Sequence, residues 1–487
     1  MENKEKSLKK NFCMNAILTM SQFIFPLITF PYVSRILLAE GTGKVSFATS
    51  IISYFAMFAQ LGIPTYGIRA CAQVRNDKKK LSKTAQEIFI INIIMSILAY
   101  IVFFIALCNV PRLKDEKTLL IIVSATIFFN AIGMEWLYKA LGQYTYITIR
   151  SVIFKFIALI AMFLLIHQQS DYIIYGAISI FASSASNIFN FFNVHKYISL
   201  RPVGEYNFKQ HLKAVSVFFA LSCAATIYVN LDTVMLGFMK TNVDVGYYNA
   251  AVKIKTILVS IVTSLGTVLL PRASYYVEHG LKEDFYRITK KAINFVFLVA
   301  TPLMLYFMFF AKEGIFFLSG NTYGGAIVPM QIIMPTLFFI GLTNIMGMQI
   351  LVPLGKENIV LYSEIVGAVV DLAINYILIP KYASAGAAIG TLVAEIAVWI
   401  VQYIYLRKQI KDAYKNVRYG ILILALFLGS IASLWVKKVF SGSFIVLLNS
   451  AILFFGVYFI VLTIAKEPLI YQIEEGLLTK LKKKGKK

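Results

Sequence analysis

The sequence predicts an all-α integral membrane protein with about 14 transmembrane helices. Of the 487 residues, 59% are hydrophobic, and the mean hydropathy is +0.73, which is more apolar surface than a soluble chain of this length can bury. Apolar windows of roughly 20 residues, the length that crosses about 30 Å of hydrocarbon, recur along the whole chain. We expect each window to be a helix, because lipid offers the backbone no other partner outside a closed barrel.

The apolar windows give the expected spans in chain order. The first follows a lysine-rich start and is too long for a cleaved signal peptide, so we expect it to be retained as the first span. The windows cover residues 12–38, 44–66, 84–108, 118–140, 146–167, 172–195, 213–239, 246–271, 288–311, 326–353, 359–380, 385–406, 418–436 and 443–465.

The basic residues predict how these spans are oriented. The formal net charge is +23, and lysine and arginine gather in alternate connections, on the side that holds the N-terminus. Because cytoplasmic loops carry such an excess, both termini are expected to be cytoplasmic. The same placement explains the charge without a nucleic-acid partner, and none is expected.

A weak internal repeat predicts two lobes. Gly43 and Ala48 at the start of the second window recur as Gly246 and Ala251 at the start of the eighth. Such repeats are typical of transporters with a central site between two halves. The expected division is a six-helix lobe at 1–200, a second six-helix lobe at 201–411, and two extra helices with a basic cytoplasmic tail at 412–487.

The eighth window carries a polar stripe. Spacings alternating between four and three residues place one set on a single helix face: Asn249, Lys253, Thr256, Ser260, Thr263 and Thr267. Lys255 points elsewhere, and Asp232 in the preceding window lies at a similar depth to Lys253. Two interpretations fit: a buried lysine–aspartate pair that packs two helices, or a wet cavity in which Asp232 neutralises one lysine and the other meets a ligand.

Two further bases lie within windows. Lys155 follows Tyr144, Thr148 and Ser151 on one face of the fifth window, too deep to reach the interface easily. Arg35 lies near the outer end of the first window, where it either snorkels to headgroups or faces the cavity. Pro26 and Pro31 precede it and are expected to break the first helix. Together with Lys253 and Lys255, these bases favour an anionic ligand such as a diphosphate.

Acidic residues also lie within the spans. Glu364, Asp371 and Asn375 share a face of the eleventh window, and Glu395 lies in the twelfth. These carboxylates either bind a coupling proton or sodium ion or form interhelical hydrogen bonds. Glu87 and Glu135, near predicted cytoplasmic ends, are expected to be interfacial.

The sequence contains no motif for covalent chemistry. A phosphate-binding Walker loop, a serine nucleophile elbow and a metal-ligand spacing are all absent, so no enzyme activity, metal or cofactor is expected. The remaining candidate for energy input is coupling to H⁺ or Na⁺.

Several motifs together resemble the Wzx-type polysaccharide flippases. That family belongs to the multidrug/oligosaccharidyl-lipid/polysaccharide transporter superfamily, which also holds the MATE drug exporters and the lipid flippase MurJ. The matching stretches are 30–35 (FPYVSR), 62–69 (GIPTYGIR), 135–138 (EWLY), 146–151 (YITIRS), 232–237 (DTVMLG), 245–248 (VGYY) and 264–272 (SLGTVLLPR).

The resemblance implies fourteen helices in two lobes around a cationic cavity. It also implies that an undecaprenyl-diphosphate-linked oligosaccharide moves from the inner to the outer leaflet of the bacterial cytoplasmic membrane by alternating access, for capsule or O-antigen synthesis. Expected partners are that glycan, membrane lipids and the polysaccharide polymerase machinery. By the resemblance, the diphosphate or acidic sugars meet Arg35, Lys155, Lys253 and Lys255.

Two alternatives remain open. A MATE-like small-molecule exporter would share the fold, but buried bases would repel cationic drugs. A membrane polysaccharide polymerase or ligase would be an enzyme, and such a protein needs a larger outer loop than this chain offers.

Overall fold

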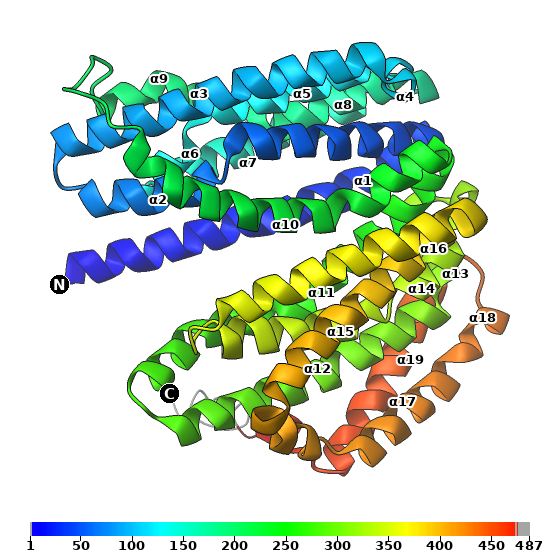
Figure 1. The fold of residues 1–487 in the computed structure, drawn as a ribbon. Helices are drawn as coiled ribbons and strands as arrows, with labels where there is room; N and C mark the ends of the chain where they lie inside the picture. Colours follow the sequence, from blue (N-terminus) through cyan, green and yellow to red (C-terminus); the bar gives the residue numbers. More distant parts are fainter. Residues whose placement is uncertain (1, 473–474, 476–487) are drawn as a thin grey trace, which may run out of the picture. The chain divides into compact units, whose positions relative to one another are not determined.

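A computed structural model describes residues 2–472 and residue 475. Every regular element in these residues is a helix (Figure 1), and the predicted all-α class is confirmed. Side chains are described from Lys10 onward, except at positions 12, 23, 265, 267, 268, 473 and 474 and beyond 475. Most of the predicted basic tail, residues 476–487, therefore lies outside the described residues.

Within the described residues, ten helices are long and apolar enough to cross a membrane, or eleven if the pair Asn321–Ile333 and Thr336–Leu351, bent by 45°, forms one span. Two of these ten helices are each interrupted by one residue whose backbone angles are not helical. These residues are Leu38, with φ 55°, and Ala383, with φ 47°. The parts on either side of each break reach the roughly 20 residues that a crossing needs. The helix Lys117–Gly133 is apolar but shorter. The multi-span architecture is confirmed, and the count of fourteen stays a prediction.

The chain forms two compact units, residues 1–246 and residues 247–487. The finer division of the sequence at 200 and 411 stays a prediction. The helices of the first unit are α1 (Glu2–Gln60), α2 (Ile63–Val74), α3 (Lys78–Asn109), α4 (Pro111–Lys114), α5 (Lys117–Gly133), α6 (Glu135–Ala140), α7 (Tyr144–Leu165), η1 (Gln169–Asp171), α8 (Tyr172–Ile180), η2 (Phe181–Ala185), α9 (Asn187–Asn193), η3 (Val194–Lys196) and α10 (Lys209–Met239).

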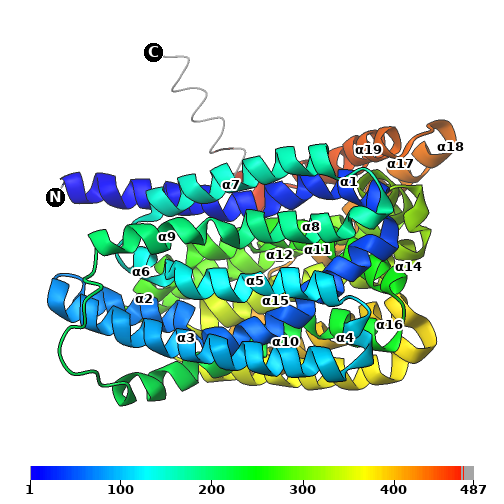
Figure 2. The same cartoon turned by 90° about the horizontal axis from the view of Figure 1, so that it is seen from above.

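Helix α1 is the centre of the first unit. It packs against α3, α5, α7 and α10, and Figure 1 and Figure 2 both show its chain turning back on itself. The residue with non-helical backbone angles inside it is Leu38, with φ 55°. The predicted break at Pro26 and Pro31 is wrong, because α1 stays helical through both prolines. A proline inside an apolar helix loses one backbone hydrogen bond, which neighbouring groups in a membrane protein can replace. The turn instead falls where the first apolar window ends.

The second unit begins within α11 (Asn242–Glu278). Its remaining helices are α12 (Lys282–Phe309), α13 (Ala311–Ser319), η4 (Asn321–Ala326), α14 (Ile327–Ile333), α15 (Thr336–Asn344), η5 (Ile345–Leu351), α16 (Glu357–Lys415), α17 (Tyr419–Leu434), α18 (Val436–Val439) and α19 (Ser443–Ile464). Helices α12, α15 and α16 pack together around an apolar cluster of this unit, and α17 packs along α19.

Candidate functional site

The first unit contains a polar pocket of about 550 Å³, between the second half of α1, α5 and α10. Small-molecule sites in proteins fall in the range of about 300–1,000 Å³. Seven of its lining residues carry a hydroxyl or an amide: Ser53, Gln60, Thr126, Asn130, Ser222, Thr226 and Asn230. None of the described residues that line it carries a formal charge. We call it the polar pocket.

Helical spacing brings these groups together. Ser222, Thr226 and Asn230 recur every fourth residue and so share one face of α10. Thr126 and Asn130 have the same spacing on α5. The sequence contains this spacing, but the charged residues within the spans were the stronger sequence signal of a site.

The break between α1 and α2 contributes to the lining of the polar pocket. Gly62, which lines it, has φ 71°, a conformation that glycine adopts without strain. A Cβ atom there would lie 2.5 Å from the backbone of Phe218 on α10. Only glycine therefore lets the broken helix approach α10 this closely.

The polar groups of the pocket are partly engaged with the protein. Asn230 Nδ2 donates to the Thr226 carbonyl at 3.0 Å, and Asn130 Oδ1 accepts from Asn187 Nδ2 at 3.2 Å. The Thr126 hydroxyl is buried without a partner among the described residues. Hydroxyls and amides both donate and accept, so this lining can exchange hydrogen bonds with a neutral ligand rich in hydroxyl groups.

Two predicted cations belong to the first unit. Arg35 is exposed on α1, and its guanidinium donates to the Pro31 carbonyl one turn earlier. Lys155 on α7 is half-buried, and its Nζ donates to Ser21 Oγ on α1 at 2.7 Å. Neither is among the described residues that line the polar pocket. A role for either in ligand binding stays a prediction.

The members of the predicted pair of Asp232 with a lysine belong to different units. Asp232 is buried on α10, with 4% of its surface exposed, whereas Lys253 and Lys255 are half-buried on α11. Asp232 belongs to the first unit and the two lysines belong to the second. The pairing of Asp232 with either lysine stays a prediction.

The hydroxyls of the α11 stripe bond within their own helix. Thr256, Ser260 and Thr263 donate to the carbonyls of Val252, Ile257 and Val259 at 2.8, 2.6 and 2.9 Å. These hydroxyls therefore present lone pairs, not protons, to their surroundings. Asn249 is half-buried one turn before Lys253, and the side chain of Thr267 lies outside the described residues.

The structure brings two of the predicted α16 groups together. Asp371 is 1% exposed and accepts from Asn375 Nδ2 at 3.1 Å. Both pack against Gly390 in the second half of α16, where a Cβ atom would overlap the Asn375 amide. Glu395 is also buried, whereas Glu364 is half-buried. An ion-coupling role for Glu364, Asp371 and Glu395 stays a prediction.

No three His, Cys, Asp or Glu side chains in the described part of the chain are grouped as metal ligands would be.

Solved structures with the same fold are membrane transporters. The lipid II flippase MurJ in an inward closed conformation matches with a TM-score of 0.72 and 18% identity, over 93% of this chain and 99% of that chain. A multidrug resistance MATE family transporter of the MOP superfamily, in an inward-facing conformation, matches with a TM-score of 0.66 and 14% identity, over 83% of this chain and 99% of that chain. At these identities the likeness establishes the fold.

Sequence relatives cover most of the chain. A putative O-antigen transporter of Escherichia coli (strain K12) is 23% identical over 410 residues, which make up 84% of this chain and 98% of the relative. The capsular polysaccharide biosynthesis protein CapF of Staphylococcus aureus is 22% identical over 413 residues, or 83% of this chain and 99% of the relative. Residues 8–277, more than half of the chain, match the family described as "Polysaccharide biosynthesis protein". The resemblance predicted from the motifs is confirmed: the chain belongs to the polysaccharide biosynthesis protein family.

Proposed function

We propose that the protein is a flippase for an undecaprenyl-diphosphate-linked oligosaccharide repeat unit. It moves this unit from the inner to the outer leaflet of the bacterial cytoplasmic membrane, for capsule or O-antigen synthesis. The observation that carries the proposal is the polar pocket, an uncharged recess whose lining includes seven hydroxyl and amide groups in a chain made of apolar helices. The relatives named as a putative O-antigen transporter and a capsular polysaccharide biosynthesis protein support this choice of cargo.

The barrier to flipping is the cost of taking sugar hydroxyls out of water. An uncompensated hydroxyl costs roughly 2–7 kcal/mol in an apolar medium, so an oligosaccharide cannot cross lipid unaided. Serine, threonine, asparagine and glutamine side chains replace the water hydrogen bonds while the prenyl tail remains in lipid. The protein then lowers a desolvation barrier without breaking a covalent bond.

The charged residues complete this proposal. Arg35, Lys155, Lys253 and Lys255 attract the diphosphate, whose charge is the second obstacle to crossing. Glu364, Asp371 and Glu395 supply sites for a coupling proton or sodium ion. Alternating access exposes the cargo to one leaflet at a time, with both termini cytoplasmic, and the released unit passes to the polysaccharide polymerase machinery.

A transport assay with purified full-length protein tests this function. Vesicles carrying the protein receive a fluorescent undecaprenyl-diphosphate oligosaccharide in one leaflet, and a membrane-impermeant glycosidase reports its arrival in the other. We expect transfer in protein-containing vesicles and only background transfer in empty ones. Background transfer by folded protein, under imposed H⁺ and Na⁺ gradients as well, would overturn the proposal.

The same vesicles separate the two alternatives. A MATE-like exporter would move a fluorescent organic cation and leave the lipid-linked sugar in place. The polar pocket argues against cationic cargo, because no carboxylate is among the described residues that line it. A polymerase or ligase would join lipid-linked units, which mass spectrometry of the extracted lipids would detect as longer chains.

A further inference from the structure

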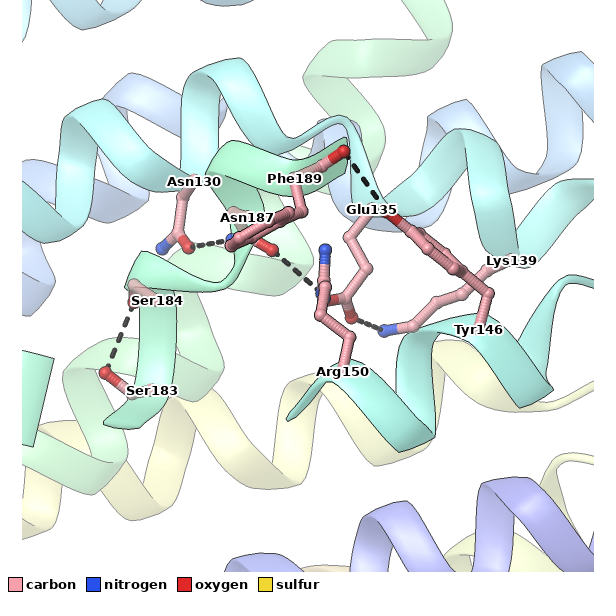
Figure 3. Close-up of polar contacts among 9 residues, drawn as sticks. All are labelled: Asn130, Glu135, Lys139, Tyr146, Arg150, Ser183, Ser184, Asn187 and Phe189. Carbon is pink, nitrogen blue, oxygen red and sulfur yellow. Dashed lines mark hydrogen bonds and ion pairs between the residues drawn. The ribbon is translucent and has the colours of Figure 1, made fainter. Parts of the chain in front are cut away.

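One wall of the polar pocket is tied to an arginine that does not line it (Figure 3). Asn130 on α5 lines the pocket, and its Oδ1 accepts from Asn187 Nδ2 on α9 at 3.2 Å. Asn187 Oδ1 in turn accepts from Arg150 Nη2 on α7 at 3.1 Å. Arg150 and Asn187 are 7% and 5% exposed, and neither is among the described residues that line the pocket. Two hydrogen bonds in series therefore connect a buried guanidinium with a pocket residue.

The guanidinium sets the direction of both hydrogen bonds. An arginine side chain has donors only, so the Asn187 group that meets it must be the amide oxygen. The Asn187 nitrogen then faces Asn130, and Asn130 must meet that nitrogen with its own oxygen. The two ends of an amide have nearly the same shape, so packing alone does not choose between them. The donors of Arg150 therefore hold each amide in one of its two orientations.

A break in the chain holds the arginine and the amide together. Met134, with φ 42°, separates α5 from α6 and places Glu135 at the start of a new helix. Glu135 Oε2 lies 3.4 Å from Arg150 Nη2. Gly133, just before the break, leaves room for Asn187, since a Cβ atom at Gly133 would lie 2.5 Å from Asn187 Cβ. The carboxylate and the amide therefore meet the guanidinium because the helix is broken at this point.

The Asn130 nitrogen is the group that remains for a molecule in the polar pocket. The Asn130 oxygen is occupied by Asn187, whereas Nδ2 has no hydrogen-bond partner in the described part of the chain and is not fully buried. Figure 3 shows Nδ2 on the side of Asn130 that points away from Asn187. An amide nitrogen donates and does not accept, so this wall of the pocket offers a donor.

The walls that α1 and α10 form offer acceptors. Ser53 on α1 donates its hydroxyl to the Thr49 carbonyl at 2.8 Å, so it presents lone pairs to the pocket. Asn230 on α10 donates through Nδ2 to the Thr226 carbonyl at 3.0 Å, which leaves its Oδ1 as an acceptor. A cargo hydroxyl suits either kind of wall, because it rotates to donate or to accept. An acetamido group carries a fixed carbonyl acceptor and a fixed N–H donor, and so matches a pocket with walls of both kinds.

We propose that Asn130 is a specificity-determining residue of the polar pocket, and that Asn187, held by Arg150, is the positioning residue that makes it a donor. The donor takes a cargo oxygen that accepts and does not donate, the carbonyl of an acetamido sugar. This assignment rests on the proposed flippase function and deepens it by naming a group of the cargo. Because Asn187 is not among the described lining residues, its substitution reverses the polarity of the wall without replacing a residue of the wall.

Transport of two cargoes by the full-length protein tests the proposal. The vesicle assay compares two undecaprenyl-diphosphate oligosaccharides, one built of N-acetylglucosamine and one of glucose, each with the same fluorescent terminal sugar. The readout is the ratio of the N-acetylglucosamine rate to the glucose rate. Asn187→Asp has the same shape but only acceptors, so Asn130 turns its nitrogen to the new carboxylate and its oxygen to the pocket. A glucose hydroxyl can donate to that oxygen and a carbonyl cannot, so the ratio should fall about tenfold, the effect of roughly 1.4 kcal/mol.

Asn187→Ala is the matched control at the same position. It removes the partner of Asn130 and leaves that amide free to take either orientation. With the competent orientation about half populated, the ratio should stay within about twofold of the wild type. If Asn187 served packing alone, the order would be reversed, because alanine removes more of the side chain than aspartate does. Thermal unfolding in detergent shows whether each variant is folded.

Two outcomes would overturn the proposal while leaving the flippase function intact. One is a wild-type ratio for Asn187→Asp, and the other is a larger fall in the ratio for Asn187→Ala than for Asn187→Asp. If Asn187→Asp fails to fold, Asn130→Asp decides in its place, because it puts an acceptor oxygen directly on the wall and should also lower the ratio. A folded wild type that moves neither cargo would instead overturn the flippase function, and this assignment with it.

Discussion

Gly43 on α1 and Gly246 on α11 lie in reciprocal backbone contact. A Cβ atom on Gly43 would overlap the Asn242 carbonyl and lie 2.9 Å from the Gly246 nitrogen, and one on Gly246 would overlap the carbonyl of Ala39. These are the two glycines that the predicted internal repeat makes equivalent.

The glycine contact predicts a steric sensitivity. Gly43→Ala and Gly246→Ala should each destabilise the protein by about 1–3 kcal/mol, because the backbones must separate to admit a methyl group. Thermal unfolding in detergent measures the effect. Gly456→Ala is the matched control, since a Cβ atom there meets nothing within 4 Å, and it should be neutral or stabilising by up to about 1 kcal/mol. Equal melting temperatures for Gly43→Ala and Gly456→Ala would show that the contact is not tight.

The polar pocket predicts which neutral residues matter for transport. Asn230→Ala and Thr226→Val each remove a hydrogen-bonding group from the lining while leaving the helix able to form. Loss of one hydrogen bond of about 1.4 kcal/mol to the crossing sugar lowers the rate roughly tenfold. The vesicle assay measures this rate.

Asn449→Ala is the control for the polar pocket. Asn449 donates to the carbonyl four residues earlier, as Asn230 does, but it is half-buried on α19 and is not among the described residues that line the polar pocket. Its loss should leave transport unchanged. An equal fall in rate for Asn449→Ala and Asn230→Ala would mean that the asparagines act on helix stability and not on cargo.

The helical architecture could be predicted because span length and hydropathy are local properties. The windows 418–436 and 443–465 lie within a residue or two of α17 and α19. The break at Met134 could not be predicted, since it depends on Asn187 packing against Gly133, far away in the sequence. The break at Leu38 falls where a predicted span ends. The break predicted at Pro26 and Pro31 is wrong, because lipid-embedded helices tolerate proline.

The candidate site was harder to predict than the fold. Charged residues within spans are the strongest sequence signal of a binding site, yet none of the described residues that line the polar pocket is charged. Hydroxyls such as Thr256 are ambiguous in a sequence, because a helix can satisfy them through its own carbonyls. Whether a hydroxyl lines a pocket or bonds its own helix depends on the neighbouring helices.

The two lysines of α11 give a third prediction. Residues two apart point to different sides of a helix, so Lys253 shares the stripe with Asn249 and Thr256 and Lys255 does not. We expect Lys253→Ala to reduce flipping at least about tenfold, the effect of about 1.4 kcal/mol, and Lys255→Ala to reduce it less. Lys255→Ala serves as the matched control, because it removes the same side chain from a different side of the same helix. The assignment to Lys253 fails if Lys255→Ala is the more damaging change.

Glu87 gives the last prediction. Its expected position near the membrane interface stays a prediction, and within the protein it is fully buried on α3. Its carboxylate accepts from the Asn207 backbone nitrogen at 2.6 Å, from Gln210 Nε2 at 3.0 Å and from His211 Nε2 at 2.8 Å. One side chain thus ties the segment before α10 to α3.

Removing the Glu87 carboxylate should release that segment. Glu87→Ala leaves several buried donors without an acceptor and should cost about 3–5 kcal/mol, whereas Glu87→Gln keeps one acceptor oxygen and should cost less. Thermal unfolding measures the loss of stability, and trypsin should cleave faster after Lys209, which lies between Asn207 and Gln210, two of the hydrogen-bond partners of Glu87. Glu205→Ala, exposed in the same segment, should change neither. If Glu87→Ala unfolds and is cleaved as the wild type is, the carboxylate does not hold the segment before α10. The apolar contacts of α10 would then be enough to hold it in place.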